Sequence, residues 1–303
     1  MGKRFVSIGE CMVEMSGGED RTYRLGYAGD TLNTIWYARA LLPADWTSDY
    51  VTALGDDLYS MQMRAFLDAA GIGTGHIQEI PGKRPGLYLI HQHEGDRHFT
   101  YWRDNSAAKL LAEDEAALAS ALKGADLIYF SGITLAILTP RARGRLLKAI
   151  IAARDGGARI AFDPNARPAL WRSPTVMRTH ITVGATLADI VLPSFADETQ
   201  FFGDVTREET AERYLGLGIE EVAVKDGGEP ALIATRADGA ETVAPQPGAR
   251  LVDPTGAGDA FNGTYLAARL TGQSPSEAAR AAHRVAGIVV GHKGALVDPA
   301  LLR

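Results

Sequence analysis

The sequence predicts a doubly wound α/β fold, in which a mostly parallel sheet is flanked by helices. Short apolar runs alternate with longer amphipathic ones along the 303 residues, as in consecutive βαβ units. The expected strands are continuously apolar, which is typical of a parallel sheet that is covered on both faces. Residues 11–26 and 85–103 break this alternation with period-2 patterns and no helical partner. They predict a second, smaller β-sheet.

The expected elements follow one another along the chain. The strands are expected at residues 4–8, 50–54, 126–130, 158–162, 189–192 and 221–224. The helices are expected at residues 30–42, 57–70, 113–122, 141–154 and 257–270. Strand and helix alternate in these two sets, which favours parallel strands joined by crossover helices.

The smaller sheet is expected to contain a hairpin, with strands at residues 86–93 and 97–103 joined by a turn at 94–96. Tyr101 and Arg103 are two positions apart, so a strand would place both on one face. No repeat or linker divides the chain. We therefore expect one domain over residues 1–303, with a lid built from insertions at residues 11–28 and 84–104.

Composition excludes several classes of protein. Lysine and arginine number 31 against 37 aspartates and glutamates, a net charge of -6 that disfavours nucleic-acid binding. No apolar run reaches the roughly 18 residues of a membrane span, and the N-terminus lacks the pattern of a signal peptide. The single cysteine, Cys11, cannot form an internal disulfide, which suits a reducing compartment. The expected protein is cytoplasmic and binds neither nucleic acid nor membrane.

The stretch at residues 252–261, VDPTGAGDAF, is the most informative motif. Small residues at Gly256, Ala257 and Gly258 would let the backbone approach a ligand, and the N-terminus of the following helix suits an anion such as phosphate. Asp259, in the first helical turn, could accept a proton from a hydroxyl that attacks phosphorus. The alternative is a helix cap, in which Asp259 only complements the helix dipole. The spacing alone leaves both interpretations open.

Two better-known glycine motifs are missing from the chain. Phe261 stands where G-x-G-x-x-G would need its last glycine, and no Gly-Lys pair is followed by Ser or Thr. A dehydrogenase is therefore the weaker rival.

The motif at residues 253–261 resembles the C-terminal signature of the ribokinase-like (PfkB) carbohydrate kinases. Residues 29–34, GDTLNT, resemble the family's N-terminal signature. Further similar stretches extend from the first strand to the last helix, and within the family the likeness is greatest to the 2-keto-3-deoxygluconate kinases. The resemblance implies a ribokinase-like fold and ATP-dependent phosphorylation of 2-keto-3-deoxygluconate at its terminal hydroxyl, which gives 2-keto-3-deoxy-6-phosphogluconate.

The same resemblance implies the catalytic residues. Asp259 would be the catalytic base, kept ionised by the helix N-terminus, and the backbone of Gly256, Ala257 and Gly258 would form the anion hole. Loose phosphoryl-transfer transition states demand positioning and charge neutralisation more than a strong base.

Substrate contacts are implied in two regions. Gly29, Asp30 and Asn33 match the family's sugar-binding segment, although Asp30 and Asn33 could equally cap the helix that follows. Tyr88, Tyr101 and Arg103 lie on the presumed lid, where Arg103 could pair with the carboxylate of a sugar acid. Arg167 matches a further polar contact. Without the resemblance, isolated arginines would be interpreted as surface residues and hairpin tyrosines as packing residues.

Nucleotide contacts are implied for Lys225, Gly227 and Gly228, in the turn after the strand at 221–224. They are also implied for Asn165, Gly256 and Gly258, and Mg²⁺ is expected to neutralise the phosphates of ATP. The family often carries an N-x-x-E element that helps to place magnesium. Glu198 fits its acid, but Phe195 replaces its asparagine. Asp253 would organise the loop or a monovalent cation.

Two alternative functions remain open, one within the sugar kinases and one outside the enzymes. A fructokinase or ribokinase would act on a neutral sugar, and a non-catalytic sensor would bind sugar and nucleotide without turnover. Sheets that pair between subunits, as in several relatives, would give a homo-oligomer through the lid.

Overall fold

The computed structural model describes residues 3–17, 22–93, 96–247 and 250–302. Within these residues the main sheet has eight strands in the order β14-β13-β12-β11-β10-β9-β1-β4. Strands β4 to β12 along this order pair in parallel, and β13 and β14 add an antiparallel edge. The strands are β1 (Lys3–Ile8), β4 (Trp46–Val51), β9 (Leu127–Ser131), β10 (Arg159–Asp163), β11 (Ile190–Val191), β12 (Glu221–Val224), β13 (Ala231–Thr235) and β14 (Gly239–Val243).

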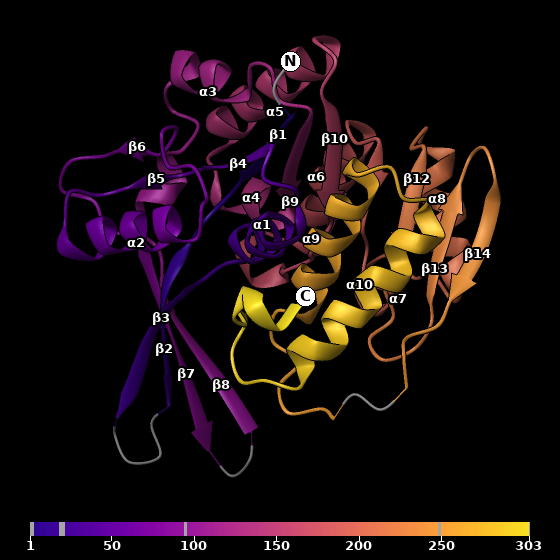
Figure 1. Cartoon of the computed structure of the whole chain (residues 1–303). Helices are drawn as coiled ribbons and strands as arrows, with labels where there is room; N and C mark the ends of the chain where they lie inside the picture. Colours follow the sequence, from indigo (N-terminus) through magenta and orange to yellow (C-terminus); the bar gives the residue numbers. More distant parts are fainter. Residues whose placement is uncertain (1–2, 18–21, 94–95, 248–249, 303) are drawn as a thin grey trace.

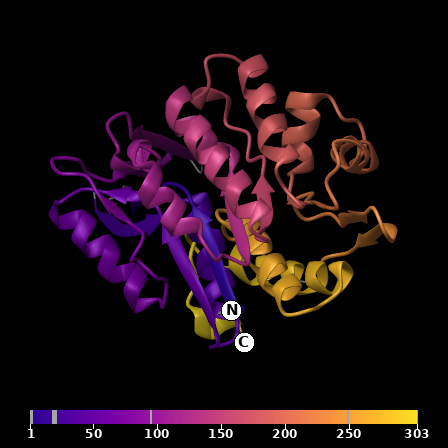
Figure 2. The same ribbon diagram turned by 90° about the horizontal axis from the view of Figure 1, so that it is seen from above.

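Helices cover both faces of this sheet (Figures 1 and 2). Successive side chains of a strand point to opposite faces of the sheet, and two neighbouring residues of β1 illustrate this. Phe5 belongs to a core cluster that also contains residues of α1, α2, α9 and α10, whereas Val6 belongs to one that contains residues of α3, α5, α6 and α8. The helices are α1 (Asp30–Leu41), α2 (Leu58–Ala69), α3 (Glu115–Leu122), α4 (Gly132–Ile137), α5 (Pro140–Asp155), α6 (Pro174–Thr186), α7 (Phe195–Phe202), α8 (Arg207–Gly216), α9 (Ala257–Leu270) and α10 (Pro275–Val290). The predicted doubly wound architecture is confirmed.

The smaller sheet extends from one end of the main sheet in the order β3-β2-β7-β8 (Figure 1). Its strands are β2 (Met12–Gly17), β3 (Tyr23–Ala28), β7 (Gly86–His93) and β8 (Asp96–Trp102). The predicted hairpin is therefore present, although residues 94 and 95 of its turn lie outside the described residues. β2 pairs in parallel with β7, which joins the two interrupting segments into one sheet.

Some elements differ from the sequence-based prediction. The strand expected at 50–54 is split, because β5 (Ala53–Leu54) leaves the main sheet to pair with β6 (Gln78–Glu79). The antiparallel pair β13 and β14 and the helices α4, α6, α7, α8 and α10 were not predicted individually. None of the helices in the described part of the chain is long and apolar enough to cross a membrane.

Candidate active site

Several predicted site residues lie at the carboxyl ends of the parallel strands or in helices that begin near them. The smaller sheet extends from the same end of the main sheet (Figure 1). Asp163 is the last residue of β10, and Lys225 follows β12 directly. The first turns of α1 and α9 reach the same place, because Asn33 and Asp259 are hydrogen-bonded. Ligands of open α/β sheets bind at this end of the strands.

Asp259 lies in the first turn of α9 and is half-buried. Asn33 Nδ2 donates to its Oδ2 over 2.8 Å. The pKa of Asp259 is raised to about 7, mainly by burial and also by the negative charges of Asp30 and Asp163, against the opposing effects of Asn33 and Lys225. This raised pKa differs from the expectation that the helix N-terminus keeps the carboxyl ionised, and burial is its largest cause.

Asn33 makes one hydrogen bond at the start of its own helix, α1, and one to Asp259. Its Oδ1 accepts a hydrogen bond from the Gly29 amide over 3.3 Å, while its Nδ2 serves Asp259. The capping alternative for Asn33 is not borne out, because Gly29 is the N-cap residue of α1 and the helix has no side-chain cap hydrogen bond. Gly29 is packed so closely that a Cβ would lie 2.2 Å from the Glu10 carbonyl oxygen. The glycine is required by this backbone contact.

A buried polar network lies close to Asp259, and two of its members, Asp163 and Asn262, were not predicted as site residues. Asp163 Oδ2 accepts from Asn262 Nδ2 over 2.6 Å and from Lys225 Nζ over 2.9 Å. Lys225 Nζ also donates to Asn262 Oδ1 over 2.9 Å. Asn262 is fully buried and Asp163 nearly so. Asn262 follows Asp259 by three positions, so the two share one helix face, a spacing that could have identified it.

Asn165 connects this network to α1. Its amide nitrogen donates to Asp163 Oδ1 over 3.0 Å, and its Nδ2 donates to Asp30 Oδ2 over 2.8 Å. Its φ of 33° lies in the left-handed region, which asparagine tolerates better than most residues. The pKa of Asp30 is raised, mainly by burial. Asn165 thus links Asp163 to Asp30 of the predicted sugar-binding segment.

The start of α9 has the backbone geometry that an anion site needs. Gly256 is the N-cap residue with a φ of 77°, and a Cβ there would lie 2.6 Å from the Ala295 carbonyl oxygen. The Ala257 amide donates to the Pro254 carbonyl over 3.2 Å. A Cβ at Gly258 would meet nothing within 4 Å. Of the predicted anion hole, Ala257 already has a backbone partner, and Gly258 lies beside open space.

Two loops frame this helix start. Asp253 accepts from the amides of Thr255 (2.9 Å) and Gly294 (2.8 Å), so its carboxylate holds the loop together. After Lys225 the chain makes a turn in which Gly227 has a φ of 56°. A Cβ at Gly227 or Gly228 would meet nothing within 4 Å, which leaves room for a ligand on this turn.

The model of the pfkB family of carbohydrate kinases matches residues 3–300. The chain belongs to this family. It is 38% identical over 304 residues to a 2-dehydro-3-deoxygluconokinase of Escherichia coli, covering 98% of each chain, and 37% identical over 302 residues to that of Dickeya dadantii, covering 97% of each. A solved structure of a putative ribokinase II from E. coli, in complex with ATP and Mg²⁺, superposes with a TM-score of 0.83 at 26% identity, over 97% of this chain and 94% of that one.

Glu198, the acid of the predicted N-x-x-E element, lies in α7, the helix that follows β11. Glu198 is fully buried and accepts from Arg213 Nη2 over 2.6 Å and from the Tyr214 hydroxyl over 3.1 Å, so it faces α8. Burial raises its pKa to about 7. The preceding residue, Asp197, is half-buried and lies 3.6 Å from Arg167 Nη1. The pKa of Asp197 is raised, mainly by burial, and its ion-pair partner Arg167 is one of the predicted substrate residues.

The predicted substrate residues of the smaller sheet are brought together. Tyr88 and Tyr101 stand opposite each other on β7 and β8, with ring centroids 5.7 Å apart. The guanidinium carbon of Arg103 lies 6.0 Å from the Tyr101 centroid, as their predicted common face requires. Tyr88 is buried and its hydroxyl donates to Glu14, whereas Tyr101 is half exposed. Arg103 is paired with Glu10, a partner that the sequence did not indicate.

Arg167 takes a more peripheral position. It is exposed, donates from Nη1 to the Ala166 carbonyl over 2.7 Å and approaches Asp197. It can reach a ligand only by moving from this position.

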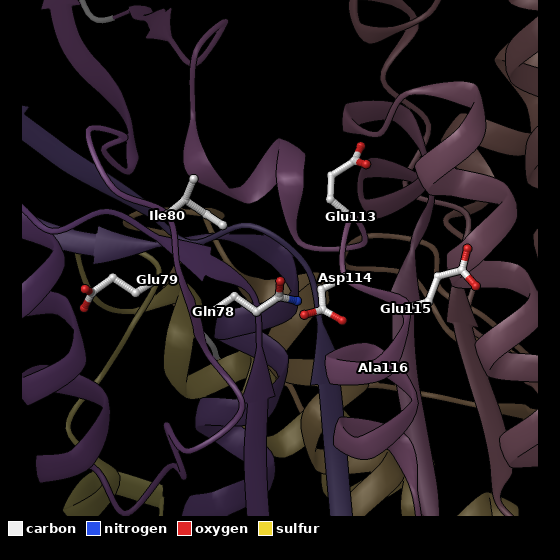
Figure 3. Close-up of a pocket in the computed structure, with 7 residues that line it drawn as sticks. All are labelled: Gln78, Glu79, Ile80, Glu113, Asp114, Glu115 and Ala116. Atoms are coloured by element: carbon white, nitrogen blue, oxygen red, sulfur yellow. The ribbon is translucent and has the colours of Figure 1, made fainter.

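A surface pocket away from these residues is shown in Figure 3. None of the predicted site residues lines it, and it lies beside α3 at the end of the molecule opposite the smaller sheet (Figure 1). Its lining residues are Gln78, Glu79, Ile80, Glu113, Asp114, Glu115 and Ala116. So many carboxylates would repel the phosphates of a nucleotide. The pocket is therefore not the kinase site.

Proposed function

We propose that this kinase transfers the γ-phosphoryl group of ATP to the terminal hydroxyl of 2-keto-3-deoxygluconate, giving 2-keto-3-deoxy-6-phosphogluconate. Support for the substrate comes from the 37–38% identity to 2-dehydro-3-deoxygluconokinases over nearly the whole of each chain, since 2-dehydro- and 2-keto-3-deoxygluconate are the same compound. The observation that carries the reaction is the hydrogen bond between Asn33 and Asp259. It joins the predicted sugar-binding segment to the predicted base.

Asp259 is suited to act as the general base. With a pKa of about 7 it is partly ionised at neutral pH and can accept the hydroxyl proton as the new O–P bond forms. Asn33 orients the carboxylate by holding Oδ2, which leaves Oδ1 to receive the proton. Asp30, one turn from Asn33, is placed to accept a second sugar hydroxyl.

Mg²⁺, backbone amides and a lysine together would neutralise the negative charge of the ATP phosphates. ATP supplies the phosphoryl group, and Mg²⁺ neutralises the negative charge of its phosphates. The first amides of α9 have no partner within the helix and can donate to the transferring group. Lys225 adds a positive charge, held in place by Asp163 and Asn262.

The residues present fit a magnesium ion that keeps phosphate and water oxygens as most of its ligands. No cluster of three or more His, Cys, Asp or Glu side chains suited to a metal occurs in the described residues, so there is no dedicated protein cage. Mg²⁺ in phosphoryl-transfer sites is held through one or two carboxylates together with the phosphates. Asp197 is the carboxylate that we assign to it, in place of Glu198.

The smaller sheet is proposed to serve as a lid that carries Tyr88, Tyr101 and Arg103 over the sugar, within a single domain. Leu25 on its edge strand β3, and Phe99 and Trp102 on the opposite edge strand β8, are apolar and exposed. Pairing of two copies through this sheet would give a homo-oligomer, which light scattering of the purified chain would detect. We place the enzyme in the cytoplasm, where ATP is available.

One observation favours the alternative of a neutral sugar. Arg103, which would bind the acid group of a sugar acid, is already paired with the buried Glu10. A fructokinase or ribokinase would need no free arginine at this position.

The experiment is ADP release by purified protein with ATP and Mg²⁺, measured on 2-keto-3-deoxygluconate, 2-ketogluconate, fructose, ribose and adenosine. Asp259→Asn, tested alongside, should lose turnover on every acceptor. Highest kcat/KM on the keto acid supports the proposal. A preference for fructose or ribose would replace it with the neutral-sugar alternative, and tight binding without turnover would indicate a sensor.

A further inference from the structure

The carboxylate of Glu10 lies between the two sheets. Glu10 follows β1 by two residues and is 2% exposed. Its Oε2 accepts from Arg103 Nη2 and its Oε1 accepts from the Ser106 hydroxyl. Both donors follow β8, the last strand of the smaller sheet. One buried carboxylate therefore connects the main sheet to the base of the smaller one.

The backbone around Glu10 leaves space for this contact and for little else. A Cβ on Gly86, the first residue of β7, would lie 2.8 Å from Glu10 Oε1 and 3.2 Å from Arg103 Cβ. The Glu10 carbonyl packs against Gly29 in the predicted sugar-binding segment. Glu10 is thus fixed relative to the sugar segment through its backbone and to Arg103 through its side chain.

Arg103 retains donors after this pairing. Its contact with Glu10 uses Nη2, and its Nε and Nη1 have no hydrogen-bond partner among the residues that the structure describes. The arginine side chain is 13% exposed, so it reaches the solvent side of the pair. A guanidinium offers five N–H groups in a planar fork, enough for two carboxylates at once.

We infer that Glu10 is a positioning residue, which fixes Arg103 in advance so that its remaining N–H groups receive the carboxylate of the sugar acid. This inference rests on the proposed function. A free arginine would lose rotamer freedom on binding its ligand, whereas one already held by Glu10 has lost it before binding. The pairing of Arg103 then serves acid recognition and ceases to be evidence for a neutral sugar.

The test is a double-mutant cycle on KM for 2-keto-3-deoxygluconate. Glu10→Gln keeps the side-chain size and an oxygen that can accept from Arg103, but removes the charge. We expect it to raise this KM about tenfold, with KM for ATP and kcat changed less than twofold. Arg103→Ala should raise the same KM about a hundredfold. In the double variant Glu10→Gln/Arg103→Ala, this KM should be the same as in Arg103→Ala alone. Glu113→Gln is the matched control, because Glu113 also pairs with an arginine, Arg145, but lies at the pocket of Figure 3.

A second single substitution covers the case in which Glu10→Gln does not fold. Ser106→Ala leaves the Glu10–Arg103 pair intact and removes the other hydrogen bond to Glu10. It should raise KM for the sugar acid about threefold, again only when Arg103 is present.

Three results would overturn the inference. An unchanged KM for the sugar acid in both Glu10→Gln and Ser106→Ala would show that Arg103 needs no positioning. Recovery of the wild-type KM in the Glu10→Gln/Arg103→Ala double variant would show that the pair is only structural, since removal of both members of a buried pair is often tolerated. No turnover of the sugar acid by the wild type would overturn the proposed function itself, and this inference with it.

Discussion

Asn33 donates a hydrogen bond to Asp259 over 2.8 Å, although the two residues are 226 positions apart in the chain. One stands on the first helix and the other on the ninth, and both lie in first helical turns at the carboxyl ends of the sheet. A hydrogen bond to the ionised carboxylate favours ionisation, so Asn33 opposes the effect of burial on the pKa of Asp259. A residue of the predicted sugar-binding segment therefore lowers the pKa of the proposed base.

Replacement of Asn33 should therefore alter the pH dependence of the reaction. Asn33→Ala removes a hydrogen bond that lowers the pKa of Asp259, so that pKa rises. The acidic limb of the profile of kcat/KM against pH should shift to higher pH. An unshifted limb, measured with saturating ATP, would show that Asp259 is not the group that titrates.

Replacement of Asp259 should abolish most of the turnover. General-base catalysis contributes about 10²- to 10⁴-fold, so we expect kcat of Asp259→Asn to fall by about this factor. Binding of ATP, measured by calorimetry, should persist, because the amide keeps the size of the side chain. A variant with wild-type kcat would disprove the role of Asp259.

The same substitution should stabilise the protein at alkaline pH. The folded pKa of Asp259, about 7, lies above the roughly 3.9 of an unfolded aspartate, so the native state binds the proton more tightly. The stability that this proton gives is fully present below about pH 3.9 and is lost as pH rises through 7. Asp259→Asn should therefore melt at a higher temperature than wild type at pH 8, with a smaller difference at pH 5. A lower melting temperature at pH 8 would contradict the raised pKa.

Lys225 should matter for stability as well as for nucleotide binding. It pairs over 2.9 Å with Asp163, and both side chains are nearly buried. Removing one partner of a buried pair costs about 3–5 kcal/mol, so Lys225→Met should lower the free energy of unfolding by this order. Lys225→Met/Asp163→Asn should regain part of the loss. Urea unfolding of the three variants measures both effects, and a purely additive double variant would argue against direct pairing.

Gly256 and Gly258 form a matched pair for testing the backbone of the anion site. Gly256→Ala places a Cβ at a φ of 77° and 2.6 Å from a carbonyl oxygen, so it should destabilise the fold by about 1–3 kcal/mol. Gly258→Ala meets open space, and its effect on stability should be small. Thermal unfolding of both variants makes the comparison, and equal losses would disprove the strain argument.

Much of the fold was predictable because its elements carry strong local patterns. The helix predicted at 257–270 and the strand predicted at 221–224 have the bounds of α9 and β12. Glycine positions with steric requirements, such as Gly29 and Gly256, also gave clear sequence signals. The antiparallel edge of the main sheet did not, because β13 and β14 carry no signal of which strand they pair with.

The site was less predictable wherever it depends on the choice of partner. Glu10 and Arg103 are 93 positions apart, and only the arrangement of the two sheets makes them a pair. Glu198 and Asp197 are adjacent, but one step along a helix turns a side chain by about 100°. Glu198 therefore pairs with Arg213 of α8, whereas Asp197 approaches Arg167. The raised pKa of Asp259 results from burial and from carboxylates on other elements, which the sequence motif does not show.

The most direct test of the proposed reaction is ³¹P NMR of the product formed from ATP, Mg²⁺ and 2-keto-3-deoxygluconate. We predict a new phosphomonoester signal coupled to the two protons of the terminal methylene group, formed by the wild type and not by Asp259→Asn. A protein that yields no such signal from the sugar acid, but phosphorylates fructose or ribose under the same conditions, would contradict the assigned substrate.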